Sequence, residues 1–457
     1  MSNFRTIDRQ TPYLFHPSME EWLAEDHLAR FIVEAVERMD LSAFCSQYAG
    51  RGTRAYHPEM LLALLIYAYA TGVFSSRRIE QATYDSVPFR YISANTHPDH
   101  DTLATFRRRF LNEFADIFLQ VLELAQQMRL LKLGQVCVDG SKIHANASKH
   151  SALSYGHIDT QRARLQEEIK QIMALAEGAD QTPLPEGLKL PEELKRRQER
   201  LATMDAAKAE IERRAQERYA REKADYDAKM KQRQDQEQST GKKPRGKAPK
   251  APDPTPRAED QVNLTDSESR IMKSAGGGFE QSYNAQAAVD QESYLVVAAY
   301  VTQAANDKQQ IEPMLEQLQS LPEPLGRVTH LVADAGYCSA TNIAACETAS
   351  IEPYIAVGKE AKTLGVLERF AAPEALPEGA NTLQKMQHKL KTQAGRALYA
   401  VRKCTVEPVF GIIKSVMGFR QFSMRGLEKA EGEWRLVCLA WNLKRMAKMH
   451  PSCVQSG

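Results

Sequence analysis

The feature that most restricts the fold is a long, charged, helical stretch between the first strand expected from the sequence and all the later ones. Residues 134–148 are rich in valine and then break at Gly140, which predicts a strand that ends in a turn. Strand signals return only at residue 279. Because a single strand is not stable alone, we expect residues 134–148 to pair with strands that lie far along the chain.

Residues 149–278 are therefore expected to form an insertion with a structure of its own. In residues 159–235, apolar side chains recur at helical spacing among dense charges, on both sides of a Pro/Gly-rich joint. This pattern predicts an antiparallel hairpin of two helices, resembling a coiled coil. Residues 239–257 form a Pro/Lys-rich linker with too few apolar residues for a core, and we expect it to be disordered.

The residues that follow the insertion alternate between strand and helix patterns. From residue 279 the order is strand, strand, helix, strand, helix, strand and then a further helix. Three strands followed by alternating helices and strands predict a mixed sheet with helices on both faces. We therefore expect an α/β core composed of residues 131–148 and 279–450.

Residues 1–130 are expected to form a mostly helical domain. Residues 60–74 are apolar nearly all round, which predicts a buried helix. Residues 75–92 follow with amphipathic spacing, which predicts a second helix that lies at the surface.

A long periodic stretch ends this domain. Asp101 and Thr102 have helix-start chemistry and precede apolar residues at helical spacing up to residue 128, which predicts one continuous helix. Three consecutive arginines, residues 107–109, lie inside it. They can either reach phosphate groups or form a solvated helix face.

Composition excludes several classes of protein. The seven cysteines are scattered, with no CxxC pair and no histidines at zinc-site spacing, which argues for a reducing cytoplasm and against disulfides or a structural zinc. No apolar run has the form of a signal peptide or the length of a membrane-spanning helix, so we expect no membrane partner.

Basic charge is concentrated locally, although the net charge is only +2. Residues 396–448 contain 11 Lys/Arg and 4 Asp/Glu, and residues 241–257 contain 6 and 1. Surfaces of this kind suit a polyanionic partner. Solvated charged faces are an equally good explanation of these counts.

Two aspartates stand out because each follows a run of apolar strand residues. Asp139 ends the strand in VCVDG, and Asp334 ends the strand in HLVADAGY. A carboxylate in such a position is costly unless it is paired, hydrogen-bonded or bound to a metal ion. A turn, of the Asp-Gly type at Asp139, is the simpler explanation of either aspartate when it is considered alone.

A third acid, Glu407, lies in the helical stretch YAVRKCTVEPVFGIIK (399–414). Helical geometry places it on a narrow face with Gly411, Lys414 and Gly418. The opposite side is expected to be a buried stripe, formed by Val409, Ile412, Ile413 and Val416.

The proline that follows Glu407 bears on where this helix starts. Pro408 is tolerated best in a first turn, so we expect Glu407 near the helix start. A glutamate favoured there by the helix dipole is the alternative explanation. That alternative leaves the glycine- and lysine-rich face unexplained, whereas the close approach of a bulky anion would account for it.

Together the three acids support one hypothesis. Asp139 and Asp334 on neighbouring strands, with Glu407 on a helix packed against them, can converge on two divalent ions. Carboxylates and water are the ligands that Mg²⁺ or Mn²⁺ prefers. Two such ions can stabilise the attacking and leaving oxygens of an in-line phosphoryl transfer.

At this point the sequence resembles a known family. VDGSK and ADAGY are similar to the segments that carry the first two acids of bacterial insertion-sequence transposases of the DDE superfamily. The stretch 399–414 resembles their Tyr-Arg-Glu-Lys signature, with Tyr399, Arg402, Glu407 and Lys414 as the matching residues. The commonest form of that signature has three residues between Arg and Glu, whereas this chain has four.

The resemblance implies a fold, a reaction and partners. The catalytic domain would be RNase H-like, and the helical N-terminal domain would serve in DNA binding or assembly. Asp139, Asp334 and Glu407 would bind two Mg²⁺ or Mn²⁺ ions, and a metal-activated water would cut a strand at the transposon end. The freed 3′-hydroxyl would then attack target DNA. The partners would be double-stranded DNA, as terminal inverted repeats and target, and other copies of the chain in a homodimer or larger complex at the bacterial nucleoid.

The resemblance also implies roles in DNA binding. Arg402 and Lys414 would hold phosphates, the arginine as a fork and the lysine as a point charge. Tyr399 would stack on or bond to DNA, or else belong to the core, and Lys142 would contact phosphate. We expect His144 to be structural. Asn284 and Asp307 are expected to support the site without binding metal.

Two competing functions remain open from the sequence. A structure-directed nuclease on the same RNase H-like fold would hydrolyse DNA without strand transfer, because the first chemical step is shared. A non-enzymatic DNA-binding scaffold that assembles through its hairpin would not need the three acids.

Overall fold

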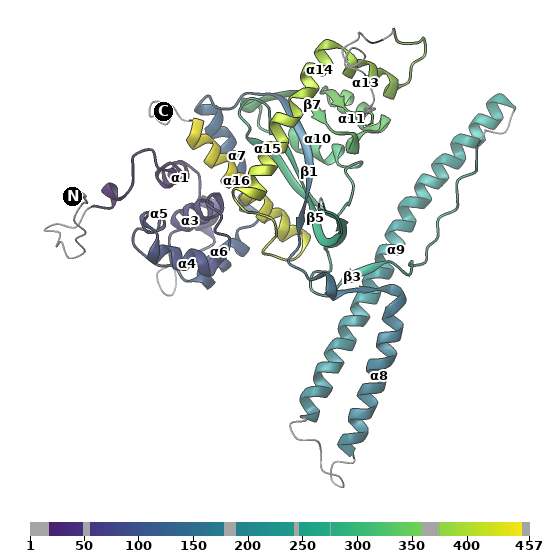
Figure 1. Cartoon of the computed structure of the whole chain (residues 1–457), viewed down its shortest axis with the longest axis horizontal. Coiled ribbons are helices and arrows are strands. Elements are labelled where there is room, and N and C mark those ends of the chain that lie inside the picture. The colour runs from purple at the N-terminus through teal and green to yellow at the C-terminus, as the bar shows by residue number, and fades with distance from the viewer. Residues whose placement is uncertain are drawn as a thin grey trace, which may run out of the picture. The chain divides into compact units, whose positions relative to one another are not determined.

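The computed structural model describes residues 18–48, 55–177, 189–241, 246–274, 276–358, 373 and 375–449 (Figure 1). These residues form two compact units. The first contains Met1–Ile143, Asn284–Met424 and Glu428–Gly457, and the second contains His144–Tyr283 and Arg425–Leu427. Most of the predicted Pro/Gly-rich joint (178–188) and part of the predicted linker (242–245) lie outside the described residues.

The N-terminal part of the first unit is helical, as predicted. Every residue of α3 from Leu61 to Ala70 is buried, which confirms the buried helix expected from its apolar sequence. The helices are α1 (Leu28–Glu37), α2 (Ser42–Ser46), α3 (Pro58–Ala70), α4 (Ser76–Asp85), α5 (Val87–Ile92), α6 (His100–Arg109) and α7 (Glu113–Gln127).

Two helices expected to be continuous are each broken in two. The first breaks at Ser86, whose extended backbone separates α4 from α5, and Pro88 lies in the first turn of the new helix, where proline is tolerated. The second is the helix predicted up to residue 128, which is divided into α6 and α7. Its chain leaves helical geometry at Phe110, and this turn lets Phe110 and Phe114 both pack against Phe44.

The start of α6 also differs from the prediction. The N-cap is Asp99, whose side chain accepts a hydrogen bond from the Thr102 backbone N–H at 2.8 Å, so Asp101 is not the capping residue. Tertiary packing around Phe44, which the local sequence pattern does not contain, accounts for the break.

Arg107 fits neither of the roles considered for it from the sequence. Its side chain is 9% exposed and donates to the Tyr69 hydroxyl (2.8 Å) and to the Phe74 carbonyl (3.1 Å). It lies 4.0 Å from Glu433, which is fully buried and accepts from Tyr69 at 2.7 Å. This network joins the helical N-terminal part to the C-terminal helix, so Arg107 is not available for phosphate.

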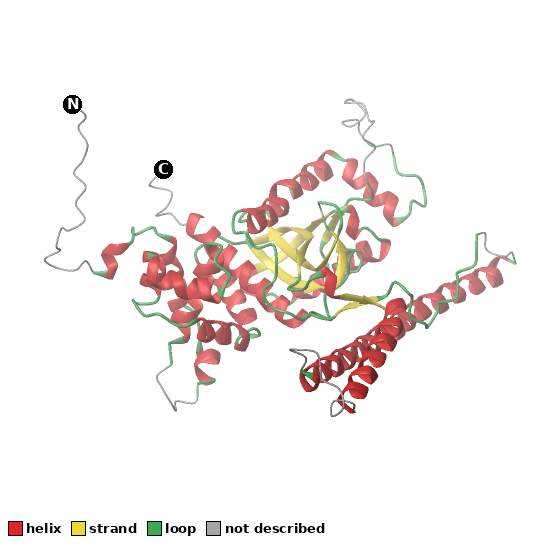
Figure 2. Cartoon of the chain, turned by 60° about the horizontal axis from the view of Figure 1, so that its bottom comes forward, coloured by secondary structure: helices red, strands yellow, loops and turns green. Residues whose placement is uncertain are grey.

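A six-stranded mixed sheet, which lies mostly in the first unit, confirms the predicted α/β core (Figure 2). Its strands lie in the order β4-β5-β1-β7-β8, and β6 also pairs with β5. The pairs β1–β7 and β7–β8 are parallel, whereas β4–β5 and β5–β6 are antiparallel. The strands are β1 (Leu133–His144), β4 (Arg270–Lys273), β5 (Phe279–Asp290), β6 (Val296–Thr302), β7 (Gly326–Ala333) and β8 (Glu352–Ile355).

Both faces of this sheet are covered. Side chains alternate between the faces of a strand, yet every residue of β5 from 281 to 290 is buried. Trp434 of the last helix donates its ring N–H to the Gln286 carbonyl at 3.0 Å. The helices of this part are α10 (Ile311–Gln319), α11 (Ala340–Thr348), α13 (Thr382–Lys391), α14 (Gln393–Ala400), α15 (Arg402–Ser415) and α16 (Leu427–Met449).

The predicted end of the first strand is wrong. β1 continues through Gly140 to His144 instead of turning there. A Cβ atom at Gly140 would lie 2.1 Å from Gln286 Nε2 and 2.7 Å from Asp307 Oδ1. The glycine therefore serves the close approach of neighbouring side chains and not a turn.

The second unit contains the predicted hairpin. Helices α8 (Tyr155–Glu177) and α9 (Leu190–Thr240) run side by side and contact a short antiparallel pair, β2 (Ala152–Ser154) and β3 (Gln261–Asn263). Ion pairs link Glu168 with Arg197 (3.0 Å) and Asp159 with Lys208 (2.7 Å), so residue numbers fall along α8 as they rise along α9. The two helices are thus antiparallel, as predicted.

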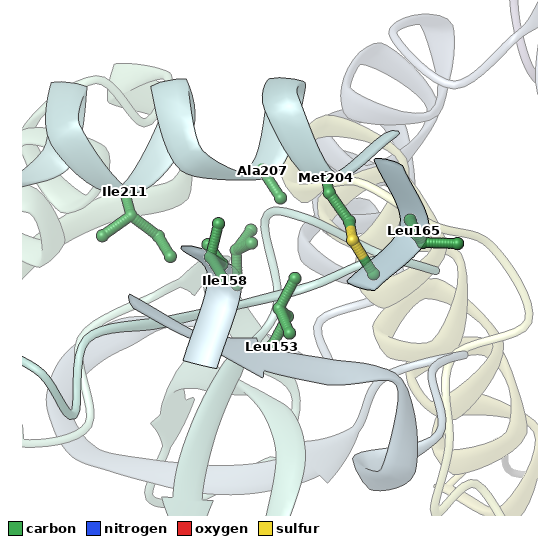
Figure 3. Close-up of a cluster of buried hydrophobic side chains, with 7 residues drawn as sticks. Leu153, Ile158, Leu165, Met204, Ala207 and Ile211 are labelled. Atoms are coloured by element: carbon green, nitrogen blue, oxygen red, sulfur yellow. The ribbon is translucent and has the colours of Figure 1, made fainter. Parts of the chain in front are cut away.

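Apolar side chains from both helices fill the space between them. Met204, Ala207 and Ile211 on α9 point toward Ile158 and Leu165 on α8 (Figure 3). Beyond this cluster α9 continues without α8, and the chain that returns after it is attached by an Arg218–Asp260 ion pair (2.8 Å). α9 reaches Thr240, so the predicted linker starts later than expected. None of the helices in the described residues is long and apolar enough to cross a bilayer.

Candidate active site

The register of the sheet brings Asp139 and Asp334 together. Val138 of β1 is paired with Ala333, the last residue of the parallel strand β7. Asp139 is the next residue of β1, and Asp334 directly follows β7. Asp334 caps a short 3-10 turn and accepts from the Gly336 backbone N–H at 2.8 Å. The prediction that the strands preceding the two aspartates are neighbours is confirmed.

Asp139 lies in an environment that disfavours its charge. Burial raises the pKa of this carboxyl to about 6, against the opposing effects of the Gly140 N–H and the Arg402 guanidinium. The negative charges of Asp334 and Asp307 raise the pKa further. Several acids thus share one small region of the first unit.

Glu407 belongs to α15, but not at its start. The helix begins at Arg402, so Glu407 is a mid-helix residue and Pro408 lies inside the helix, contrary to the prediction. A proline inside a helix removes one backbone hydrogen bond.

The buried face of α15 is also turned from its predicted position. Val406, Val409, Phe410 and Ile413 are buried, whereas Val416 is 69% exposed. Phe410 stacks on Trp434 at 5.8 Å, which fixes the orientation of the helix.

The face shared by Glu407 is shorter than expected. Glu407 and Gly411 are exposed, as predicted, and Ile412 is only half-buried. Gly418 lies beyond the end of the helix in a left-handed conformation (φ 81°), so it does not share the face of Glu407.

Arg402 connects the first and third acids. Its Nη1 lies 3.3 Å from Asp139 Oδ2, and its Nη2 lies 2.8 Å from Glu407 Oε1. Burial opposes the charge of Arg402, but Tyr399 and the carboxylates of Asp139, Glu407 and Asp334 raise its pKa. The guanidinium therefore lies where the negative charge of the site is concentrated.

The three carboxylates are suited to metal binding in chemistry but are not arranged as a metal cage. Hard oxygen ligands match Mg²⁺ and Mn²⁺. Within the described residues, no group of three His, Cys, Asp or Glu side chains is placed to hold a metal ion. Arg402 contacts two of the three acids instead.

The other candidate DNA contacts lie around this centre. Burial lowers the pKa of Lys414, and nearby Asp139 opposes that effect, which places the lysine next to the site. Burial raises the pKa of Tyr399, with Arg402 opposing it. Lys142 lies 3.9 Å from Asp307.

Asp307 is the centre of a hydrogen-bond network behind the site. Its Oδ1 accepts from Asn284 Nδ2 (2.7 Å) and from Gln286 Nε2 (2.8 Å). The buried Tyr337 hydroxyl donates to Gln286 Oε1. The supporting position expected for Asn284 and Asp307 is present, whereas Gln286 and Tyr337 were missed. The two-residue spacing of Asn284 and Gln286, which places both on one face of β5, is the signal that could have found Gln286.

The contact between this network and Gly140 gives a testable prediction. Gly140→Ala should lower the free energy of unfolding by roughly 1–3 kcal/mol, because its methyl group would overlap Gln286 and Asp307. Urea unfolding of the purified protein measures the change. Gly411→Ala is the matched control, because nothing lies within 4 Å of its Cβ and alanine favours a helix by roughly 0.5–1 kcal/mol. Equal stability of the two variants would contradict the prediction.

Comparison with known proteins supplies the family. Residues 17–109 match a family model described as "Transposase domain (DUF772)", and residues 247–443 match one described as "Transposase DDE domain". The second match includes Asp334 and Glu407 and begins after Asp139. No curated protein and no solved structure matches the chain. Two transposase domain models match in the order expected from the sequence, and the second includes two of the three acids. Together they indicate an insertion-sequence transposase of the DDE family.

Proposed function

We propose that Asp139, Asp334 and Glu407 are the catalytic and metal-binding residues of this transposase, within a core of the RNase H-like type. The pairing of Val138 with Ala333, which sets the two aspartates side by side, is the observation that carries the proposal. Arg402 supports it by linking Glu407 to Asp139. The central position of β1, parallel to β7 and followed in the sheet by β8, supports the fold.

Transposases of this family need divalent metal ions. We propose Mg²⁺ or Mn²⁺, two ions, held by the oxygens of the three acids. Bound there, the ions would supply positive charge to the attacking and leaving oxygens of phosphoryl transfer. The chain's own residues would orient the substrate around them.

Four side chains are proposed to hold the DNA. Arg402 would grip a phosphate with two parallel hydrogen bonds, and Lys414 and Lys142 would add point charges. Tyr399, which is partly buried beside Arg402, would position the arginine or contact the DNA directly. The helical N-terminal part would bind the ends of the element or assemble the complex.

The reaction proposed is cleavage at the terminal inverted repeats and joining of the freed 3′-hydroxyl to target DNA. Working on two ends requires at least two copies of the chain in the active complex. Such a complex would act on DNA in the bacterial cytoplasm, at the nucleoid.

A strand-transfer assay tests the reaction. Short duplexes that carry the inverted repeats flanking the coding region are incubated with the protein, target plasmid and Mg²⁺ or Mn²⁺. Joined products support transposition. Cleavage without joined products under either metal would indicate the structure-directed nuclease instead.

A further inference from the structure

We propose that Arg402 is an internal counter-ion that occupies the carboxylates of the active site until a DNA phosphate draws it away, so that metal binding depends on DNA binding. This inference rests on the proposed function, because it assumes that Asp139 and Glu407 are metal ligands. It adds an order of events: the protein alone resists metal loading, and DNA makes the site competent.

The Arg402 guanidinium contacts two of the three proposed metal ligands. Its two terminal nitrogens reach different acids, Asp139 at 3.3 Å and Glu407 at 2.8 Å, so one cation spans two of the three proposed ligands. The Arg402 side chain is only 12% exposed. A divalent ion that binds the same oxygens therefore has to displace a buried positive charge.

The surroundings of Arg402 favour its release from the two carboxylates when a phosphate approaches. Its Nε is buried and has no hydrogen-bond partner, so the guanidinium is incompletely satisfied. The Glu407 side chain is 47% exposed, which leaves one end of the bridge open to an approaching ligand. Because a guanidinium binds phosphate through two parallel bonds, DNA can compete for it.

Neighbouring charges favour an anion at the same place. Lys414 is close enough to Lys142 and Arg420 that both lower its pKa, in addition to the larger effect of burial. Arg420 Nε donates to the Lys414 carbonyl at 3.0 Å, which holds it at the end of α15. A phosphate that arrives here meets several cations, and Arg402 can turn toward it and away from the acids.

The two equilibria are then linked. Metal and Arg402 compete for the carboxylate oxygens, whereas the carboxylates and phosphate compete for Arg402. DNA therefore raises the affinity for metal, and metal raises the affinity for DNA by the same factor. Such an enzyme would bind its metal ions tightly only once it has bound DNA.

Direct measurement of Mn²⁺ binding, by calorimetry or by the electron paramagnetic resonance of free Mn²⁺, tests the proposal without relying on activity. Without DNA, Arg402→Gln should bind Mn²⁺ roughly tenfold more tightly than the wild type, the scale of one charge-assisted hydrogen bond. Lys403→Gln, which removes the same charge from the exposed neighbouring residue, should change the affinity little. The Mn²⁺ affinity of Arg402→Lys should lie between those of the wild type and Arg402→Gln, because a lysine cannot bridge both acids.

A second set of measurements adds the duplex that carries the inverted repeat. The duplex should tighten Mn²⁺ binding to the wild type by a larger factor than to Arg402→Gln, because the variant has no counter-ion to release. Circular dichroism and thermal unfolding confirm that the variants are folded.

The outcomes separate the two proposals. Equal Mn²⁺ affinities of the wild type and Arg402→Gln, or an equal gain in Lys403→Gln, would overturn the counter-ion role. If Asp334→Asn nevertheless abolishes Mn²⁺ binding, the proposed metal site is supported although the counter-ion role is not. No Mn²⁺ binding by any form, with or without the duplex, would overturn both the metal site and the inference.

Discussion

Asp334→Asn should lower DNA cleavage and strand transfer by roughly a thousandfold or more, the effect of losing several kcal/mol of charge stabilisation in the transition state. The amide keeps the size of the carboxylate and can still accept from Gly336, which holds the turn after β7. What it lacks is the negative charge that a divalent ion requires. Single-turnover cleavage of an end duplex measures the rate.

The control separates catalysis from folding and DNA binding. Asp101→Asn removes one carboxylate from a side chain that is 89% exposed on α6 and should leave the cleavage rate near that of the wild type. Mobility-shift measurements should show that Asp334→Asn still binds DNA. Glu407→Gln should reproduce the loss. Cleavage at the wild-type rate in both variants would refute the metal site and favour a DNA-binding scaffold that does not need the acids.

Arg107→Met should destabilise the first unit by roughly 3–5 kcal/mol, the cost of leaving a buried carboxylate without its cation. Glu433 is fully buried and accepts from Tyr69 and from the Ser423 backbone N–H (2.8 Å). These neutral donors would remain, but the compensating charge would be lost. The earliest transition in urea unfolding, followed by fluorescence of the buried Trp434, reports the change.

A neighbouring arginine provides the matched control. Arg108→Met removes the same functional group from the exposed side of α6 and should change stability by less than roughly 0.5 kcal/mol. The double variant Arg107→Met with Glu433→Leu should recover part of the loss, because no unpaired charge is then buried. An Arg107→Met protein as stable as Arg108→Met would contradict this account of the network.

The sequence predicts the parts of the fold and site that depend on local patterns. Apolar runs that end in an aspartate identify β1 and β7, and helical spacing identifies the α8–α9 hairpin. Parallel pairing then explains why Asp139 and Asp334 meet. Hydrophobic periodicity needs no knowledge of distant contacts, which is why these expectations hold.

The errors arise where distant residues decide the local structure. Gly140 looks like a turn, but side chains from β5 and from the loop before α10 require it to be a glycine in a continuous strand. The contact between Arg402 and Asp139 joins residues 263 positions apart, which no local pattern contains. Arg107 is the same residue type as its exposed neighbour Arg108 and differs in its distant partners, Tyr69, Phe74 and Glu433.

The junction of the insertion with the sheet has a consequence for the history of this enzyme. Where the chain leaves β1, the Ala145 N–H bonds to the Gln281 carbonyl at 2.9 Å, so the entry and the exit of the insertion are neighbours. When the two ends of an insertion are neighbours, its length can change with little effect on the stability of the sheet, so such a segment can be replaced as a unit, here called a cassette. The distance along the chain between the first two acids is therefore free to drift, and searches for relatives that fix this spacing would miss homologues with a shorter or a different cassette.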